Sequence, residues 1–124
     1  DITVIDDAFN SNPAGARMAV DVLSDFKQGK RIIITPGMVE LGDSQYDLNR
    51  EFGKYIGSDN HVDVMIVVGA TNRDALKQGV NESDFDTENL IVVDNFNEAQ
   101  KRLQPLLTPG ATVLYENDLP DSFK

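Results

Sequence analysis

The chain has 124 residues, of which 40% are hydrophobic and 26% charged, and its net charge is -10. This length and composition are typical of a single soluble globular domain, and no apolar run approaches the length of a membrane span. The acidic balance would repel phosphate backbones and anionic lipids, so we expect neither nucleic-acid binding nor membrane insertion. The absence of cysteine excludes disulfides and thiolate chemistry, and it is compatible with a cytoplasmic location.

Five short runs rich in Val and Ile alternate with segments of helical periodicity. The apolar runs are residues 2–5, 31–35, 62–68, 90–93 and 112–115. Nearly continuous apolar runs are typical of strands that are buried on both faces of a parallel sheet. Helices are expected over 13–26, 45–56, 71–78 and 97–107. This alternation predicts a three-layer, Rossmann-like α/β domain over residues 1–124, with a mainly parallel sheet of about five to six strands.

Several side chains can be assigned from these patterns before any site is considered. Asn12 and Pro13 are a good N-cap and first residue for the first helix. Met18 and the aromatic residues Phe26, Phe52 and Phe96 are expected in the core. The polar and acidic segment 80–89 is expected to be an exposed loop.

Polar segments follow every predicted strand. They are residues 6–12, 36–43, 69–72, 94–95 and 116–118. Ligands of open parallel sheets bind outside the carboxyl ends of the strands, so all these segments fall at the ligand-binding edge. Helix capping explains many of the single residues, but their concentration along one edge favours a site.

The segments can be tested against common chemistries. A Gly-x-Gly-x-x-Gly fingerprint, a P-loop and a Ser nucleophile elbow are all missing from the sequence. A phosphoacceptor receiver domain needs an acid after its third strand, where this chain has Gly69. Asp6 and Asp7 are adjacent and point in different directions, so they seldom chelate one metal, and we expect no metal site. A carboxylate that binds ribose hydroxyls, with amides for adenine, remains attractive.

Three segments occur in an order that resembles a known family. V-I-D-D-A-F-N-S-N-P, R-I-I-I-T-P-G-M-V-E-L-G and L-N-R-E-F-G resemble the C-terminal domain of Mur ligases, nearest to the branch that adds D-alanyl-D-alanine to a UDP-muramoyl tripeptide. The resemblance implies an ATP-dependent amide ligase of three domains, with this chain as the closing domain, inactive alone. It implies that Asp7 reaches the ribose, that Asn10 and Asn12 lie beside the adenine, and that Ser11 assists.

The same resemblance implies an acceptor site and partners. Met38, Glu40 and Leu41 would belong to a loop that faces the inter-domain cleft near the incoming amino acid or dipeptide, and Gly69 and Thr71 lie at the same edge. ATP would bind with Mg²⁺, which the missing central domain would mainly hold. The UDP-muramoyl peptide would also bind through the missing domains. A cytoplasmic monomer is expected.

Some positions depart from the family pattern. Phe9 replaces Tyr, Pro36-Gly37 replaces Gly-Asp, Asn49 replaces His, and Glu116-Asn117-Asp118 stands where Lys-Gly-Ser is usual. These changes suggest a divergent branch that has lost polar and basic contacts, and they leave the acceptor open. The alternative is a free-standing α/β nucleotide- or ligand-binding regulatory module. A chain that begins inside a strand favours the domain of a larger ligase.

Overall fold

The fold is built on five parallel strands. A computed structural model describes residues 1–7 and 12–117. The described strands are β1 (Thr3–Asp7), β2 (Arg31–Thr35), β3 (Val64–Val68), β4 (Leu90–Val93) and β5 (Thr112–Glu116), in the order β1-β5-β2-β3-β4. All four pairings are parallel, which confirms the predicted fold class. The first strand continues to Asp7 instead of ending at residue 5, because β5 pairs with it along its whole length.

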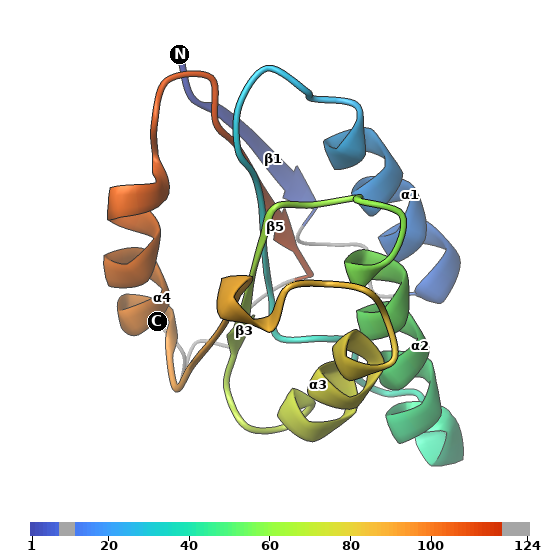
Figure 1. Cartoon of the computed structure of the whole chain (residues 1–124). Helices are drawn as coiled ribbons and strands as arrows, with labels where there is room; N and C mark the ends of the chain where they lie inside the picture. The colour runs from blue at the N-terminus through green and yellow to red at the C-terminus, as the bar shows by residue number, and fades with distance from the viewer. Residues whose placement is uncertain (8–11, 118–124) are drawn as a thin grey trace.

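Helices cover both faces of the sheet, as predicted. They are α1 (Pro13–Ser24), α2 (Gln45–Gly57), α3 (Arg73–Asn81) and α4 (Phe96–Leu103), with short 3-10 turns at Gly42–Ser44, Thr87–Asn89 and Gln104–Leu106. Figure 1 shows α1, α2 and α3 together on one side of the sheet and α4 on the other. The strands run so that their carboxyl ends lie at the lower edge in this view.

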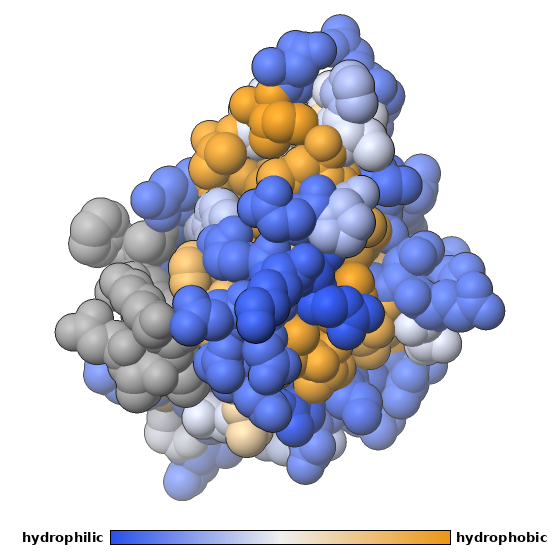
Figure 2. All heavy atoms as spheres, turned by 90° about the vertical axis from the view of Figure 1, so that its left-hand side faces the viewer, coloured by the Kyte–Doolittle hydropathy of each residue, from blue (hydrophilic) through white to orange (hydrophobic). Residues whose placement is uncertain are grey.

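Each face of the sheet has its own hydrophobic core. The larger core joins Leu23 of α1, Phe52 of α2 and Leu76 of α3 to the sheet residues Ile33 and Leu114. The smaller core lies under α4. Figure 2 looks at the α4 side and shows apolar atoms at the surface beside polar ones. On the outer strand β1, Val4 is 59% accessible.

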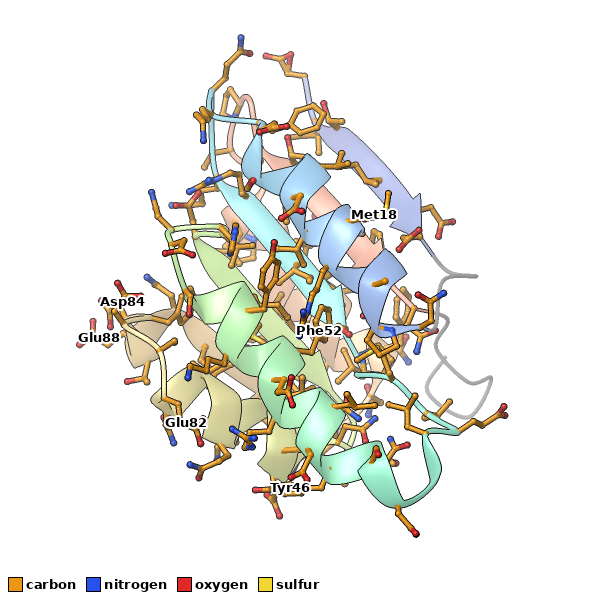
Figure 3. The ribbon with its side chains drawn as sticks, turned by 90° about the vertical axis from the view of Figure 1, so that its right-hand side faces the viewer. Met18, Tyr46, Phe52, Glu82, Asp84 and Glu88 are labelled. Atoms are coloured by element: carbon orange, nitrogen blue, oxygen red, sulfur yellow. The ribbon has the colours of Figure 1, made fainter. Side chains whose placement is uncertain are left out.

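Two of the predicted core residues lie at the surface. Met18 is 67% exposed and Phe26 37% exposed, so these predictions were wrong. The buried stripe of α1 is formed by Ala16, Ala19, Val20 and Leu23. Met18 lies outside this stripe, and in Figure 3 it sits at the side of α1 nearest β1, whereas Phe52 lies within the helical layer. Phe26 comes after the last turn of α1 and therefore leaves the stripe.

The third helix is longer than predicted. It runs to Asn81, and Val80, which was placed in the loop 80–89, is fully buried. The extra turn is possible because α2 and α3 approach backbone to backbone: a Cβ atom on Gly79 would lie 1.9 Å from the carbonyl oxygen of Arg50. The acids beyond this turn are exposed, as expected for the loop, and Glu82, Asp84 and Glu88 lie on the left-hand side of the molecule in Figure 3.

Candidate functional site

Three polar side chains form a row across the carboxyl ends of neighbouring strands. Asp7 of β1 is the register partner of Glu116 of β5, and Thr35 ends the adjacent strand β2. The Thr35 hydroxyl donates a hydrogen bond of 2.6 Å to Glu116 Oε1. Side chains alternate between the faces of a strand, so Asp7 lies on the same face as Ile5 and the larger core. The three side chains therefore cover the larger core at the carboxyl ends of the strands.

Glu116 is a strongly perturbed acid of this row. It is fully buried, and among the described residues its Oε2 atom has no hydrogen-bond partner. Its pKa is raised to about 8, chiefly because burial disfavours the charged form; the hydrogen bond from Thr35 opposes the rise, and the charge of Asp7 adds to it. Glu116 is therefore largely protonated at neutral pH, which lowers the negative charge of the row.

The loop after β2, residues 36–41, is tied to this row at its start. The N–H of Gly37 donates to Thr35 Oγ1 at 2.9 Å, and the carbonyl of Gly37 accepts a bond of 2.7 Å from Asn117 Nδ2. Gly37 has a φ of +82°, which favours glycine, and a Cβ atom there would meet the Asn49 and Asn72 side chains at less than 3 Å. The loop thus turns sharply where β5 holds it.

Three further amides hold the middle of the 36–41 loop. Met38 N–H donates to Asn49 Oδ1 at 2.8 Å, and Asn49 Nδ2 donates back to the Met38 carbonyl at 2.9 Å. Asn72 Nδ2 donates to the carbonyls of Pro36 and Met38 at 2.9 and 3.1 Å. The Met38 carbonyl also accepts from Gln45 Nε2.

The amides also bond to one another. Asn72 Oδ1 accepts from Gln45 Nε2 at 2.7 Å and from Asn49 Nδ2 at 3.2 Å. Gln45 Oε1 accepts from the N–H of Leu41 at 3.1 Å, which holds the far end of the loop. Gln45, Asn49, Asn72 and Asn117 are named here the amide cluster. It joins the starts of α2 and α3 and the end of β5 around one loop.

The predicted cleft residues of this loop differ in what they present. Met38 is fully buried in the larger core, and Leu41 packs partly against the same core. Glu40 is exposed and has a φ of +64°, an uncommon conformation for a residue with a side chain. Val39 beside it is 43% exposed. The loop therefore exposes the side chains of Val39 and Glu40 to solvent, and the buried Met38 anchors it.

Two other predicted cleft residues lie at the same edge, after β3. Gly69 is buried with a φ of +85°, and its N–H donates to the carbonyl of Val93 at 2.9 Å. Thr71 is exposed. It directly precedes Asn72, so the amide cluster links the loop after β3 to the loop after β2.

The predicted nucleotide residues are only partly described. Asp7 is half-buried at the end of β1. Asn12 is exposed, and its Oδ1 accepts from the N–H of Gly15 at 2.8 Å, so the predicted N-cap of α1 is confirmed. Asn10 and Ser11 lie outside the described residues.

Sequence reasoning missed most of the amide cluster and Glu116. It treated Asn49 as a loss of polar contacts, whereas Asn49 is fully buried and bonds to three neighbouring residues. A signal was present, because Asn49 lies three residues before Phe52 and seven before Ile56, in the buried stripe of α2. A polar residue within an apolar stripe indicates a buried hydrogen-bonding role.

Within residues 1–7 and 12–117 the chain forms neither a cluster of metal ligands nor a membrane-spanning helix. No group of three or more His, Asp or Glu side chains in these ranges could hold a metal ion. No helix in the same ranges is long and apolar enough to cross a bilayer.

Known proteins share both the sequence pattern and the fold. Residues 1–115 match the family model described as Mur ligase, glutamate ligase domain. A crystal structure of MurF from Acinetobacter baumannii aligns with a TM-score of 0.71 and 22% identity over 90% of this chain. A second crystal structure of the same protein aligns with a TM-score of 0.69 and 21% identity, also over 90%. The chain covers 23% and 24% of those two chains, which is about a quarter of their length.

Proposed function

Because the chain belongs to the Mur ligase family through its glutamate ligase domain, we propose that it is the closing domain of an ATP-dependent amide ligase of peptidoglycan precursor synthesis. The observation that carries the proposal is the family match over residues 1–115, which includes every described strand except the last residue of β5. The chain is about a quarter of the length of the matched structures. Other domains would then bind the UDP-sugar peptide and the triphosphate, and this domain would be inactive alone.

The nucleotide would meet the start of the domain. Asp7 would accept hydrogen bonds from the ribose hydroxyls, and Asn10 and Asn12 would lie beside the adenine with Ser11. The position of Asp7 supports this role, because ligands of parallel sheets bind beyond the carboxyl ends of the strands. The side-chain oxygen Oδ1 of Asn12 already caps α1, which leaves its Nδ2 group as a donor.

The acceptor would meet the 36–41 loop. Glu40 is the charged side chain that this loop presents, and a carboxylate suits the ammonium group of an incoming amino acid or dipeptide. Met38 and Leu41 would support the loop from inside, and Gly69 and Thr71 would border it. D-alanyl-D-alanine or a related compound would be joined to a UDP-muramoyl peptide in the cytoplasm.

The residues described here do not fit a role in holding Mg²⁺. No group of three potential ligands occurs among them, and Glu116 is buried and largely protonated at neutral pH. The metal that accompanies ATP would therefore be bound by the other domains.

The nucleotide role is tested in the full-length protein by Asp7→Asn. We expect the apparent KM for ATP to rise about tenfold, since a hydrogen bond to a charged group is lost, while the KM for the acceptor stays unchanged. Formation of ADP with UDP-muramoyl tripeptide and D-alanyl-D-alanine gives the readout. Asp6→Asn is the matched control, because Asp6 is the adjacent acid but points to the other face of β1.

Two results would contradict this proposal. An unchanged KM for ATP in Asp7→Asn would remove the ribose contact. A full-length wild-type protein that forms no amide with ATP, a UDP-muramoyl peptide and a panel of amino acids and dipeptides would favour a regulatory binding module instead.

A further inference from the structure

We propose that the amide cluster holds the 36–41 loop in one preformed shape and thereby positions the contacts of the acceptor. Gln45, Asn49, Asn72 and Asn117 are positioning residues in this sense, since they act through the loop. The inference rests on the proposed function and deepens it, because it identifies what fixes the acceptor side of the site.

The first support is the number of loop backbone groups that are engaged. The carbonyls of Pro36, Gly37 and Met38 all accept bonds from the cluster. The N–H groups of Met38 and Leu41 donate to it, and that of Gly37 donates to Thr35. A backbone held at so many consecutive groups has few alternative shapes, because each change would leave a buried polar group unpaired.

The second support is where the bonds come from. Gln45 and Asn49 lie on α2, Asn72 is the residue before α3, and Asn117 follows β5. Asn49, Asn72 and Asn117 are 0%, 4% and 8% exposed, so water hardly competes for their bonds. The loop is thus anchored to three separate elements of the rigid fold, as a precise binding site requires.

The third support is the strained backbone at the tip. Glu40 has a φ of +64°, and such a conformation persists where the surroundings over-determine it. The conformation directs the Glu40 side chain outward while Met38, two residues before, enters the core. Strain at the tip and firm bonds on both sides are the expected signs of a loop whose shape matters.

The chemistry of the tip indicates the class of acceptor. Val39 is an apolar group and Glu40 a carboxylate, and both are exposed. Together they suit a small acceptor that carries an ammonium group next to an apolar side chain, such as an amino acid or a short peptide. A loop that is already in its bound shape loses little conformational entropy on binding, which lowers the KM for that acceptor.

The experiment uses the full-length protein and the variants Asn72→Leu and Asn49→Leu. Hydrogen exchange of the peptide 36–42, followed by mass spectrometry, reports the loop, and amide formation reports the acceptor. We expect exchange to speed up at least about tenfold and the KM for the acceptor to rise about tenfold, with the KM for ATP within about twofold of wild type.

Val80→Ala is the matched control. Val80 is fully buried near the end of α3, away from Asn72 at its start. This variant should lower the melting temperature to a similar degree and leave both the exchange of 36–42 and the KM for the acceptor unchanged. A purely structural role of the amides would make the two kinds of variant alike.

The outcomes separate the inference from the proposed function. Unchanged exchange of 36–42 in both Leu variants would overturn the inference, as would faster exchange with an unchanged KM for the acceptor. In either case a wild type that forms amide would leave the ligase function standing. A wild type that forms no amide with any acceptor would overturn the proposed function and the acceptor role of the loop together.

Discussion

The two edges of the sheet bury polar groups by different means. At the opposite edge, where β2 and β3 begin, Arg31 is 5% exposed and its guanidinium contacts Asp63 at 3.2 Å. The same guanidinium donates to the carbonyl of Ser24 and to Asn60 Oδ1. At the carboxyl edge the side chains of the amide cluster are uncharged, and Glu116, whose pKa is raised to about 8, is largely protonated at neutral pH.

The two edges also differ in their connecting loops. The ion pair of Arg31 and Asp63 lies at the opposite edge, whose loops carry no proposed site. The neutral amides at the carboxyl edge hold the 36–41 loop without adding a buried charge, and Glu40 of that loop exposes its carboxylate. Neutral amides also keep their hydrogen bonds when pH changes, whereas an ion pair depends on the ionisation of its acid. The amides of the carboxyl edge therefore fix the shape of the 36–41 loop with bonds that do not depend on pH.

The largest expected effect comes from removing the buried cation at the opposite edge. Arg31→Leu should lower the free energy of unfolding by about 3 kcal/mol. The substitution removes the bonds of a buried cation and leaves Asp63, the Ser24 carbonyl and Asn60 Oδ1 without their donor. The KM values for ATP and acceptor should stay at wild-type levels, since this edge carries no proposed site. Urea denaturation measures the first effect, and ligase kinetics on the full-length protein measure the second.

The same pair predicts a loss of stability in acid. Burial alone would raise the pKa of Asp63, but the hydrogen bonds from the Arg31 side chain and backbone, and the charge of Arg31, together lower this pKa below its ordinary value of 3.8. A lowered pKa stabilises the folded state above the unfolded pKa, and this contribution is lost as pH falls through the folded pKa. Arg31→Leu should therefore reduce the loss of stability below about pH 4.

An exposed ion pair serves as the control for Arg31. Asp94→Ala removes the contact of 3.0 Å to Arg73, but the Asp94 side chain is 76% exposed. It should therefore change the stability by less than about 1 kcal/mol. Equal losses in Arg31→Leu and Asp94→Ala would mean that the two edges are not distinguished by a buried charge.

The next effect concerns the carboxyl edge and has the opposite sign. The pKa of Glu116 is raised from 4.5 to about 8, so the folded state binds a proton that the unfolded state releases between these values. Stability should therefore fall as pH rises through this window and level off above it. Glu116→Gln keeps an acceptor for Thr35 and remains neutral, so at pH 9 it should be more stable than wild type by on the order of 2 kcal/mol.

Melting temperatures of both proteins between pH 5 and about pH 9 test this prediction. Glu88→Gln is the matched control, because Glu88 is exposed in the loop before β4. Glu116→Gln should flatten the profile, and Glu88→Gln should not. Parallel profiles for Glu116→Gln and wild type would show that Glu116 is ionised in the fold, and the carboxyl edge would then bury a charge as well.

Much of the fold could be predicted because its signals are local. Strands 31–35 and 90–93 were predicted to the residue, since strands buried on both faces form continuous apolar runs. The start of α1 was predicted from Asn12 and Pro13 for a similar reason, because capping acts within one turn. The end of α3 was missed, because Gly79 there lowers helix propensity and its reason for being glycine is contact with α2.

The candidate site was less accessible because its parts are distant in sequence. The position of the polar loops follows from the direction of parallel strands, and Asp7 and Glu40 could be named from the family resemblance. The amide cluster could not be assembled, since Asn49, Asn72 and Asn117 meet only when α2, α3 and β5 are packed. Met18 was misplaced because an amphipathic period identifies a stripe but not every residue beside it.

The smallest expected effect separates two roles at the carboxyl edge. Asn12→Ala should cost about 1 kcal/mol of stability, because the cap on Gly15 is lost, whereas Asn12→Ser keeps a capping oxygen and should change stability by a few tenths of that. Serine lacks the Nδ2 donor, so Asn12→Ser should still raise the KM for ATP in the full-length protein. Asn95 caps α4 with a bond of 2.9 Å from Glu98 and is the matched position. Asn95→Ser should change neither the stability nor the KM for ATP. If Asn12→Ser and wild type have the same KM for ATP, Asn12 acts only as a helix cap, and the nucleotide contact is made by its neighbours.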